Sequence, residues 1–477
     1  MSEERPDIPL VSCEILEVPY ASDPALYFEL IHCEEGAVLL DSGQPSSSLG
    51  RYDIMSAWPV DVLIPEVNES AKAFFLRARR TAAGLLPAAP PSPFSAPFTG
   101  GILGYLSYDF SSRLDSLTAR QTDASDLPDA HFGVYLWALI TDHEQRKTYL
   151  LFHPNCSESQ RQLATLTCAS PGKRVLRKGF TLLKPFTPDT EEDEYRRDIE
   201  QIHRYILAGD CYQVNYTQRY QSTYEGDPWT AYQLGRAVCP TPFSAFLALP
   251  RGTICSHSPE RFMSVKDRRV ETRPIKGTRP RHPDVVEDLR LAAELRESPK
   301  DRAENVMIVD LLRNDLGRVC RTGSVKVTEL FEVETYPNVH HLVSAIEGEL
   351  SPHTDVWNLF EACFPGGSIT GAPKIRAMEI IEELERQSRS VYCGSVFYLD
   401  CRGQMDSSIT IRTLLFDRGS VFCWGGGGII HDSSWQAEYL EVGSKVGVLL
   451  RALESTLATG AGQFSSTDGH AKSVYQV

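Results

Sequence analysis

Residues 365–385 read PGGSITGAPKIRAMEIIEELE, a glycine-rich turn that runs into a segment with helical periodicity. Gly371 precedes the segment and Pro373 lies in its first turn, so the sequence predicts a loop that ends at a helix N-terminus. Exposed N–H groups at such a junction bind carboxylates or phosphates well. The spacing matches neither a P-loop nor a dinucleotide-binding fingerprint, and glycines used only for tight turns are the alternative explanation.

Helical periodicity recurs on both sides of this segment. Apolar residues in 191–208 repeat at intervals of three and four, and Gly209 ends the pattern. Ser298 is placed to cap a second helix, which has Pro299 in its first turn and ends at Gly317. A helix at 435–452 and strand-like runs at 391–400, 407–416 and 420–430 complete the pattern. Before residue 185 the sequence favours short strands with irregular connections.

The stretch ETRPIKGTRPR, residues 271–281, concentrates positive charge in a chain whose formal net charge is −15. It contains Arg273, Lys276, Arg279 and Arg281. A solvated basic turn is the ordinary explanation of such a cluster. The alternative is an anion site that contains a reactive amine. Spacing alone leaves both open.

Carboxylates on two predicted helices form a candidate metal site. Glu304 lies in the first turns of the helix that begins near residue 298, and Glu438 and Glu441 share one face of the helix at 435–452. Carboxylate oxygens from two helices would suit Mg²⁺. Because Lys445 follows Glu441 by four residues, a surface ion pair is the alternative.

Two further residues are candidates for proton transfer. Glu260, in CSHSPERF, lies sixteen residues before Lys276, and a hairpin could bring both to one cavity. A glutamate after Ser-Pro is also an ordinary turn residue. His341 precedes an apolar run, where a histidine is more often structural than catalytic.

Composition excludes several classes of protein. The 477 residues are 42% hydrophobic and 23% charged, which is typical of a folded globular chain. The acidic balance disfavours nucleic acid and anionic membranes as partners. We find neither a signal-peptide pattern nor an apolar run of about 18 residues. The twelve cysteines form no C-x-x-C pair, so we expect a reduced, cytoplasmic protein with neither disulfides nor a zinc site.

Taken together, these segments resemble the chorismate-utilising enzymes, which include the anthranilate, aminodeoxychorismate, isochorismate and salicylate synthases. The matching pieces are SPERF, ETRPIKGTRPR, DRAENVMIVDLLRNDLGRV, VHHLVSAIEG, FPGGSITGAPKIRAMEIIEELE, YCGSV, MDSSITIRTL and GGGGIIHDSSWQAEYLE. They cover about residues 190–455, and upstream GGILGYLSYD and LLDSGQPSSSLGRYDI resemble the first two enzyme types.

The resemblance implies an α+β fold, in which two large, mainly antiparallel sheets pack as a sandwich with helices on the outside. It implies an amino-terminal region at 1–185, a chorismate-binding catalytic region at 186–455 and a disordered tail at 456–477. Both regions would contribute strands to the sheets.

Lys276 distinguishes between branches of the family. Anthranilate synthases usually carry alanine at this position, whereas lysine resembles the aminodeoxychorismate synthases, which add ammonia to chorismate on the route to 4-aminobenzoate and folate. Isochorismate and salicylate synthases carry a water-activating lysine where this chain has Gln213. The alternatives are an anthranilate synthase or a non-catalytic subunit that binds chorismate or tryptophan.

The resemblance also assigns roles to residues. Glu260 would be the acid, Lys276 the nucleophile that forms a covalent adduct with chorismate, and His341 a further catalytic group. Glu304, Glu441 and Glu438 would hold Mg²⁺. Positions that would hold chorismate are Gly277, Thr278, Ser368, Lys374, Tyr392, Arg412, Gly426, Gly427 and Gly428. A tryptophan pocket would be formed by Ser42, Arg51, Tyr52, Pro242, Phe243 and Ser244.

The family's ammonia comes from glutamine. This sequence contains no glutaminase-like cysteine context, so the resemblance implies a separate glutamine amidotransferase partner. Phe397 departs from the family pattern, because relatives often have glycine there.

Overall fold

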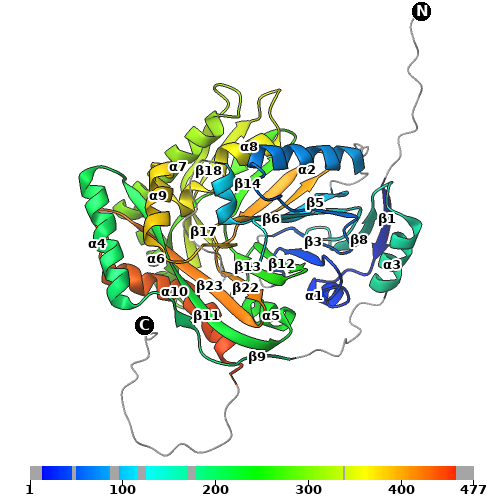
Figure 1. Cartoon of the computed structure of the whole chain (residues 1–477), viewed down its shortest axis with the longest axis horizontal. Coiled ribbons are helices and arrows are strands. Elements are labelled where there is room, and N and C mark those ends of the chain that lie inside the picture. Colours follow the sequence, from blue (N-terminus) through cyan, green and yellow to red (C-terminus); the bar gives the residue numbers. More distant parts are fainter. Residues whose placement is uncertain are drawn as a thin grey trace, which may run out of the picture.

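The computed structural model describes residues 13–45, 50–85, 96–114, 125–169, 179–336 and 339–457. Within these ranges, strands form two large antiparallel sheets that enclose the core, and helices lie outside them (Figure 1). The predicted α+β fold is confirmed. Residues 458–477, nearly all of the predicted tail, lie outside the described residues.

The first sheet has thirteen strands in the described part of the chain. In spatial order they are β1 (Glu14–Val18), β8 (Lys147–Phe152), β7 (Trp137–Asp142), β3 (Tyr52–Ser56), β2 (Val38–Asp41), β12 (Phe243–Leu249), β13 (Gly252–Ser258), β22 (Thr413–Asp417), β23 (Ser420–Ile429), β11 (Gln213–Gly226) and β10 (Thr187–Pro188), with β9 (Phe180–Leu182) and β19 (Gly371–Ala372) also paired with β11.

The second sheet has ten strands in the same ranges. Their order is β16 (Ile275–Pro280), β18 (Val339–Glu349), β15 (Arg269–Thr272), β14 (Arg261–Lys266), β21 (Met405–Ile409), β20 (Ser395–Asp400), β5 (Gly101–Leu106), β6 (Ala130–Tyr135) and β4 (Asp61–Leu63), with β17 (Lys326–Thr335) paired with β18. Both sheets therefore contain strands from before and after residue 185, so neither sequence region forms a complete sheet by itself.

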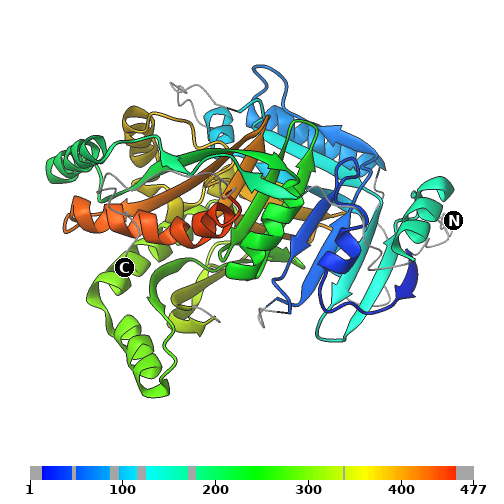
Figure 2. The same cartoon turned by 90° about the horizontal axis from the view of Figure 1, so that it is seen from below.

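The helices cover the outside of this sandwich. They are α1 (Ala25–Phe28), α2 (Ala71–Leu85), α3 (Glu158–Cys168), α4 (Glu192–Ala208), α5 (Pro228–Val238), α6 (Val285–Glu297), α7 (Pro299–Gly317), α8 (Val356–Cys363), α9 (Lys374–Leu384) and α10 (Trp435–Glu454), with short 3-10 turns η1 (Tyr108–Arg113) and η2 (Gly367–Ile369). Figure 2 shows α10 lying along the strands, where it packs against β23 between α4 and α5. No helix in the described ranges is long and apolar enough to cross a membrane.

The predicted helix signals act as the sequence indicates. Gly209 ends α4 in the left-handed region, with φ at 81°. The Ser298 hydroxyl accepts from the Asp301 N–H and caps α7, which ends at Gly317. The helices at 374–384 and 435–454 are also confirmed.

One local prediction is wrong, and one is incomplete. The run 407–416 is two strands, because Arg412 has φ of 51° and the chain turns there between β21 and β22. The region before residue 185 also contains α2 and α3, which the sequence analysis did not predict. On α2, Phe74 and Phe75 are buried against the aromatic core, so tertiary packing supports this helix.

Phe397, the departure from the family pattern, is part of the core. Its ring is 1% exposed and lies 5.0 Å from the ring of Phe132 and 5.1 Å from that of Phe360. It therefore joins β20 to β6 and α8.

A buried ion pair links three separate segments of the chain. Arg389, which is 1% exposed, donates to both carboxylate oxygens of Glu385 at 2.6 and 2.9 Å. It also donates to the carbonyls of Asn215 on β11 and Ile369 on η2. Its guanidinium lies over the ring of Tyr108, 4.6 Å from the centroid. The amino-terminal region, β11 and η2 therefore meet at one side chain.

We expect Arg389→Ala to destabilise the protein by about 3–5 kcal/mol, because it leaves the Glu385 carboxylate buried without the opposite charge of Arg389. Urea unfolding of the variant and the wild type measures this difference. Arg290→Ala is the control, since its ion pairs with Glu287 and Glu294 are exposed and its loss should shift the midpoint far less. Equal shifts for the two variants would contradict the prediction.

Candidate active site

Lys276 lies on an irregular part of β16. The register with β18 shifts between Ile275 and Thr278, which makes Lys276 and Gly277 a bulge. Gly277 has φ of 89°, and a Cβ there would lie 2.8 Å from the side chain of Leu295. A side chain is thus excluded at 277. Next to it, the Lys276 ammonium donates to the carbonyl of Ser368 at 3.2 Å.

The arginines of the same stretch bind carboxylates on neighbouring elements. Arg273 pairs with Glu329 and Glu334, Arg279 pairs with Glu294 and Asp301, and Arg281 pairs with Asp288. Since their charges are already compensated, the basic stretch is not an anion site as a whole. Within 271–281, all of which the structure describes, Lys276 is the cation bonded to Ser368.

Glu260 reaches the same serine from the loop between β13 and β14. The Ser368 hydroxyl donates to Glu260 Oε1 at 2.8 Å, and Glu260 is 5% exposed. Ser368 therefore contacts the predicted acid through its hydroxyl and the predicted nucleophile through its carbonyl. The structure brings these three predicted site residues together.

Burial shifts the pKa values of the acid and the amine in opposite directions. It raises the pKa of Glu260 to about 7, although the bond from Ser368 and the charge of Lys276 oppose the rise. Burial also lowers the pKa of Lys276, against the opposing charges of Glu304 and Glu260. Both shifts favour the uncharged forms, a carboxylic acid and a free amine.

His341 lies on β18 beside the bulge. Its Nδ1 is 2.8 Å from Thr278 Oγ1, and its ring is 2% exposed. Burial lowers the pKa of His341 to about 3, with a further contribution from the charge of Arg412, so the ring is neutral. Its Nε2 has no hydrogen-bond partner in the described structure, and Arg412 forms no ion pair there. Both groups are therefore available to a bound polar molecule.

The glycines at 426–428 leave room for the polar side chains of neighbouring elements. They lie on β23 opposite residues 215–217 of β11. A Cβ on Gly427 would lie 2.7 Å from Glu438 Oε2, and a Cβ on Gly428 would lie 2.4 Å from Gln213 Nε2. The Gln213 amide is fully buried, and neither its nitrogen nor its oxygen has a partner among the described residues.

The three predicted metal ligands come from α7 and α10. Burial raises the pKa values of Glu304 and Glu438, and the charge of Glu441 raises both further. Glu438 accepts from Ser433 Oγ at 2.7 Å. The oxygen-only chemistry of this set suits Mg²⁺, which takes hard oxygen ligands and retains water, although the ligand atoms of the three described glutamates do not all lie within 4.8 Å of one another.

Lys445 lies beside these glutamates, although its position in the sequence suggested only a surface ion pair with Glu441. It donates to Glu441 at 2.7 Å and to the carbonyl of Gly426 at 3.1 Å. Its charge also contributes to the lowered pKa of Lys276, after burial. The spacing from Glu441 signalled the ion pair, but the contact with β23 required the tertiary structure.

Two other predicted substrate residues are already engaged with the protein. Lys374 donates to Asp315 Oδ2 at 2.6 Å and to the carbonyl of Cys363 at 3.0 Å. It therefore has no uncompensated charge to offer an anion. The ring of Tyr392 is buried and stacks on Trp424 with centroids 6.2 Å apart.

The predicted tryptophan-site residues line one cavity of about 450 Å³. They are Ser42, Arg51, Tyr52, Pro242, Phe243 and Ser244. The opposite wall comes from the second sheet and includes Phe397, Tyr398 and Met405. The cavity therefore lies between the sheets and is lined by both sequence regions.

We expect the stability of the wild type relative to Glu260→Gln to depend on pH. Between pH about 4.5 and about 7, folded Glu260 retains a proton that the unfolded chain has lost, so wild-type stability falls as pH rises. Glutamine resembles the protonated form and has no such loss. The difference should therefore grow by up to about 3 kcal/mol in favour of the variant across this window, as urea unfolding at several pH values would show. A difference independent of pH would contradict the assigned protonation.

Comparison with known proteins agrees with the geometry. Residues 37–451 match the family model for chorismate binding enzyme. The chain is 43% identical to aminodeoxychorismate synthase component 1 of Klebsiella aerogenes, over 94% of this chain and all of that protein. It is also 43% identical to the Escherichia coli protein of that name, over 93% of this chain and 99% of the relative.

A solved structure supports the same assignment. Anthranilate synthase component I of Streptococcus pneumoniae superimposes with a TM-score of 0.74 at 30% identity, covering 84% of this chain and 93% of that one. With a family match across most of its length and relatives at this level of identity, the chain belongs to the chorismate binding enzymes.

Proposed function

We propose that the chain is the chorismate-converting component of an aminodeoxychorismate synthase, which makes 4-amino-4-deoxychorismate from chorismate and ammonia. The observation that carries the proposal is the contact of Ser368 with both Glu260 and Lys276. Relatives named for this activity are 43% identical, compared with 30% for the anthranilate synthase structure. Lysine at 276 favours the same branch.

The first step joins Lys276 to the substrate. Its uncharged amine forms a bond to C2 of the chorismate ring as the C4–O bond breaks. Hydroxide is a poor leaving group, so Glu260 donates its proton and the oxygen leaves as water. The lowered pKa of Lys276 and the raised pKa of Glu260 both favour the protonation states that this step needs.

In the second step ammonia forms a bond to C4, and the C2–N bond to Lys276 breaks. The amine returns to the enzyme and the amino group remains at C4. Gln213 occupies the place of the water-activating lysine of isochorismate and salicylate synthases, and an amide cannot act as a general base. Attack by water is therefore disfavoured.

Binding groups follow from the site's charges. Arg412, which forms no ion pair among the described residues, suits a bidentate bond to one substrate carboxylate. Neutral His341 and Thr278 lie beside the bulge of β16. The glycines of β23 have no side chains, so they leave the space next to Gln213 and Glu438 unfilled. Glu304, Glu438 and Glu441 would hold Mg²⁺, which would neutralise a substrate carboxylate and withdraw charge from the ring.

A glutamine amidotransferase partner would supply the ammonia. Two observations support this part of the proposal. The 43%-identical relatives are named as component 1, which implies a second component. The thiols of Cys255 and Cys363 are also buried, and burial raises their pKa values, which makes them poor nucleophiles.

Incubation with chorismate, ammonium and Mg²⁺ should yield 4-amino-4-deoxychorismate, identified by chromatography and mass spectrometry. With ammonium withheld, intact-protein mass spectrometry should find an adduct with the mass of chorismate less one water, located on Lys276. Glu260→Gln should lower kcat by about 10²–10⁴-fold, because the leaving oxygen loses its acid.

Lys276→Ala should remove the adduct, whereas Lys326→Ala, which changes an exposed lysine on β17, should retain it. Anthranilate as the sole product would replace the proposed activity with that of anthranilate synthase. Full activity in Lys276→Ala would exclude the covalent route.

The cavity between the sheets is proposed to bind tryptophan. Its volume suits a ligand of this size, and rings of Tyr52, Phe243 and Tyr398 line it together with the charges of Asp41 and Arg402. Calorimetry with L-tryptophan should show saturable binding, and Ser264→Phe, which adds a ring to the cavity wall, should weaken it at least tenfold. L-alanine is the control ligand. Equal binding by the variant would place tryptophan elsewhere.

A further inference from the structure

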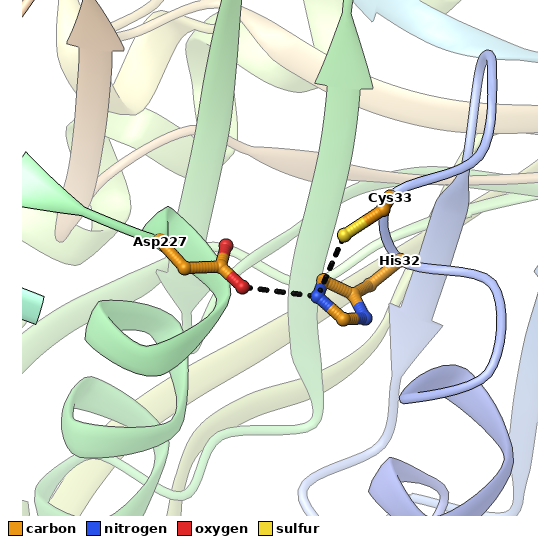
Figure 3. A group of neighbouring side chains, drawn as sticks. All are labelled: His32, Cys33 and Asp227. Carbon is orange, nitrogen blue, oxygen red and sulfur yellow. Dashed lines mark hydrogen bonds and ion pairs between the residues drawn. The ribbon is translucent and has the colours of Figure 1, made fainter. Parts of the chain in front are cut away.

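Three side chains with metal-binding chemistry, none of them a predicted site residue, meet between the segment after α1 and the start of α5 (Figure 3). His32 Nε2 lies 3.0 Å from Asp227 Oδ2 and 3.0 Å from Cys33 Sγ. All three ligand atoms lie within 4.8 Å of one another. His32 and Cys33 follow α1, whereas Asp227 precedes α5, 195 residues away from His32.

The other ring nitrogen of His32 indicates which atom carries the proton. Nδ1 lies 3.0 Å from the carbonyl oxygen of Glu29, which can only accept, so Nδ1 donates. Nε2 is then the nitrogen that faces the carboxylate of Asp227 and the sulfur of Cys33. Because Asp227 Oδ2 can also only accept, a cation bound here would replace the Nε2 proton that the metal-free contact uses. A histidine that ligates a metal through one nitrogen typically donates its other N–H to a carbonyl in this way.

The arrangement does not suit a Cys-His-Asp nucleophile. In such a triad the thiol and the carboxylate bind opposite nitrogens of the imidazole. The imidazole takes the thiol proton, and the carboxylate holds the ring in the orientation that this transfer needs. Here both groups lie at Nε2, and the Glu29 carbonyl occupies Nδ1. Convergence on one nitrogen is typical of ligands around a shared cation.

We propose that His32, Cys33 and Asp227 bind a divalent transition-metal ion of the zinc class. A thiolate, an imidazole and a carboxylate form a mixed set that suits Zn²⁺ and disfavours Mg²⁺. Tetrahedral zinc would place neighbouring ligand atoms about 3.3–3.6 Å apart, so the two 3.0 Å separations need only a small outward movement. Binding would release the Cys33 thiol proton to solvent.

Three protein ligands would leave the fourth position of a tetrahedral ion open to water, and two of these ligands would carry negative charge. Cys33 is exposed, so solvent reaches the sulfur side of the site. The thiolate and the Asp227 carboxylate would balance the charge of a divalent ion.

Such an ion would link the two sequence regions. Asp227 Oδ1 accepts from the Trp229 N–H at 3.0 Å and caps α5, so Oδ2 is the atom that faces His32. The His32 ring also stacks on Trp229, with centroids 5.8 Å apart. The ion would thus clamp the segment after α1 to the start of α5. The sequence predicted no zinc site because its cysteines form no C-x-x-C pair, and no local spacing joins residues 32 and 33 to residue 227.

Cobalt titration of the full-length protein tests the proposal. Co²⁺ bound through Cys33 gives a thiolate-to-metal charge-transfer absorption, whereas Co²⁺ held by the glutamates of the candidate active site gives none. We expect this absorption to saturate at one equivalent and to be displaced by Zn²⁺. Zinc should also raise the melting temperature of the wild type, because it binds only the folded chain with all three ligands.

Variants decide which residues bind. Cys33→Ser should abolish the absorption, and Asp227→Asn, which keeps an oxygen to cap α5, should weaken Co²⁺ binding at least about tenfold. Cys401→Ser, a half-buried cysteine on another loop, is the matched control and should bind as the wild type does. Absence of the absorption in the wild type, its retention in Cys33→Ser, or unchanged affinity in Asp227→Asn would each overturn the proposal.

Discussion

The buried Arg389–Glu385 ion pair is the constraint on which the candidate site's position depends. Its guanidinium holds the carbonyls of Asn215 and Ile369, and Glu385 accepts from the Thr217 N–H. Ile369 follows Ser368, so the same side chain that joins η2 to β11 also positions the serine that contacts Glu260 and Lys276. A buried charge pair tolerates little displacement, because either partner left alone lacks compensation.

Next to Ser368, burial is the main cause of the pKa shifts of both Glu260 and Lys276. Burial disfavours charge, so it raises the pKa of Glu260 and lowers the pKa of Lys276. The neighbouring arginines do not supply this effect, since each is paired with a carboxylate of another element. The bulge at Lys276 and Gly277 separates the amine from those cations and directs it toward η2.

Much of the helical structure follows from local signals in the sequence. Gly209 and Ser298 act within a few residues of the backbone groups that they satisfy, and their effects on α4 and α7 needed no tertiary information. Helix α2 could not be predicted in this way, since Phe74 and Phe75 gain their stability from rings contributed by η1 and α8. The break at Arg412 likewise depends on a backbone conformation that arginine does not signal.

The amino-acid sequence predicts the family resemblance, the α+β class and the residue types of the candidate site, because these depend on the order and spacing of short motifs. Which charges are compensated follows from the folded structure, which pairs Arg273, Arg279, Arg281 and Lys374 with carboxylates and leaves Arg412 without an ion pair among the described residues. It also brought His32 and Asp227 together. Contacts between residues hundreds of positions apart are set by how two sheets close around one core, which no local pattern encodes.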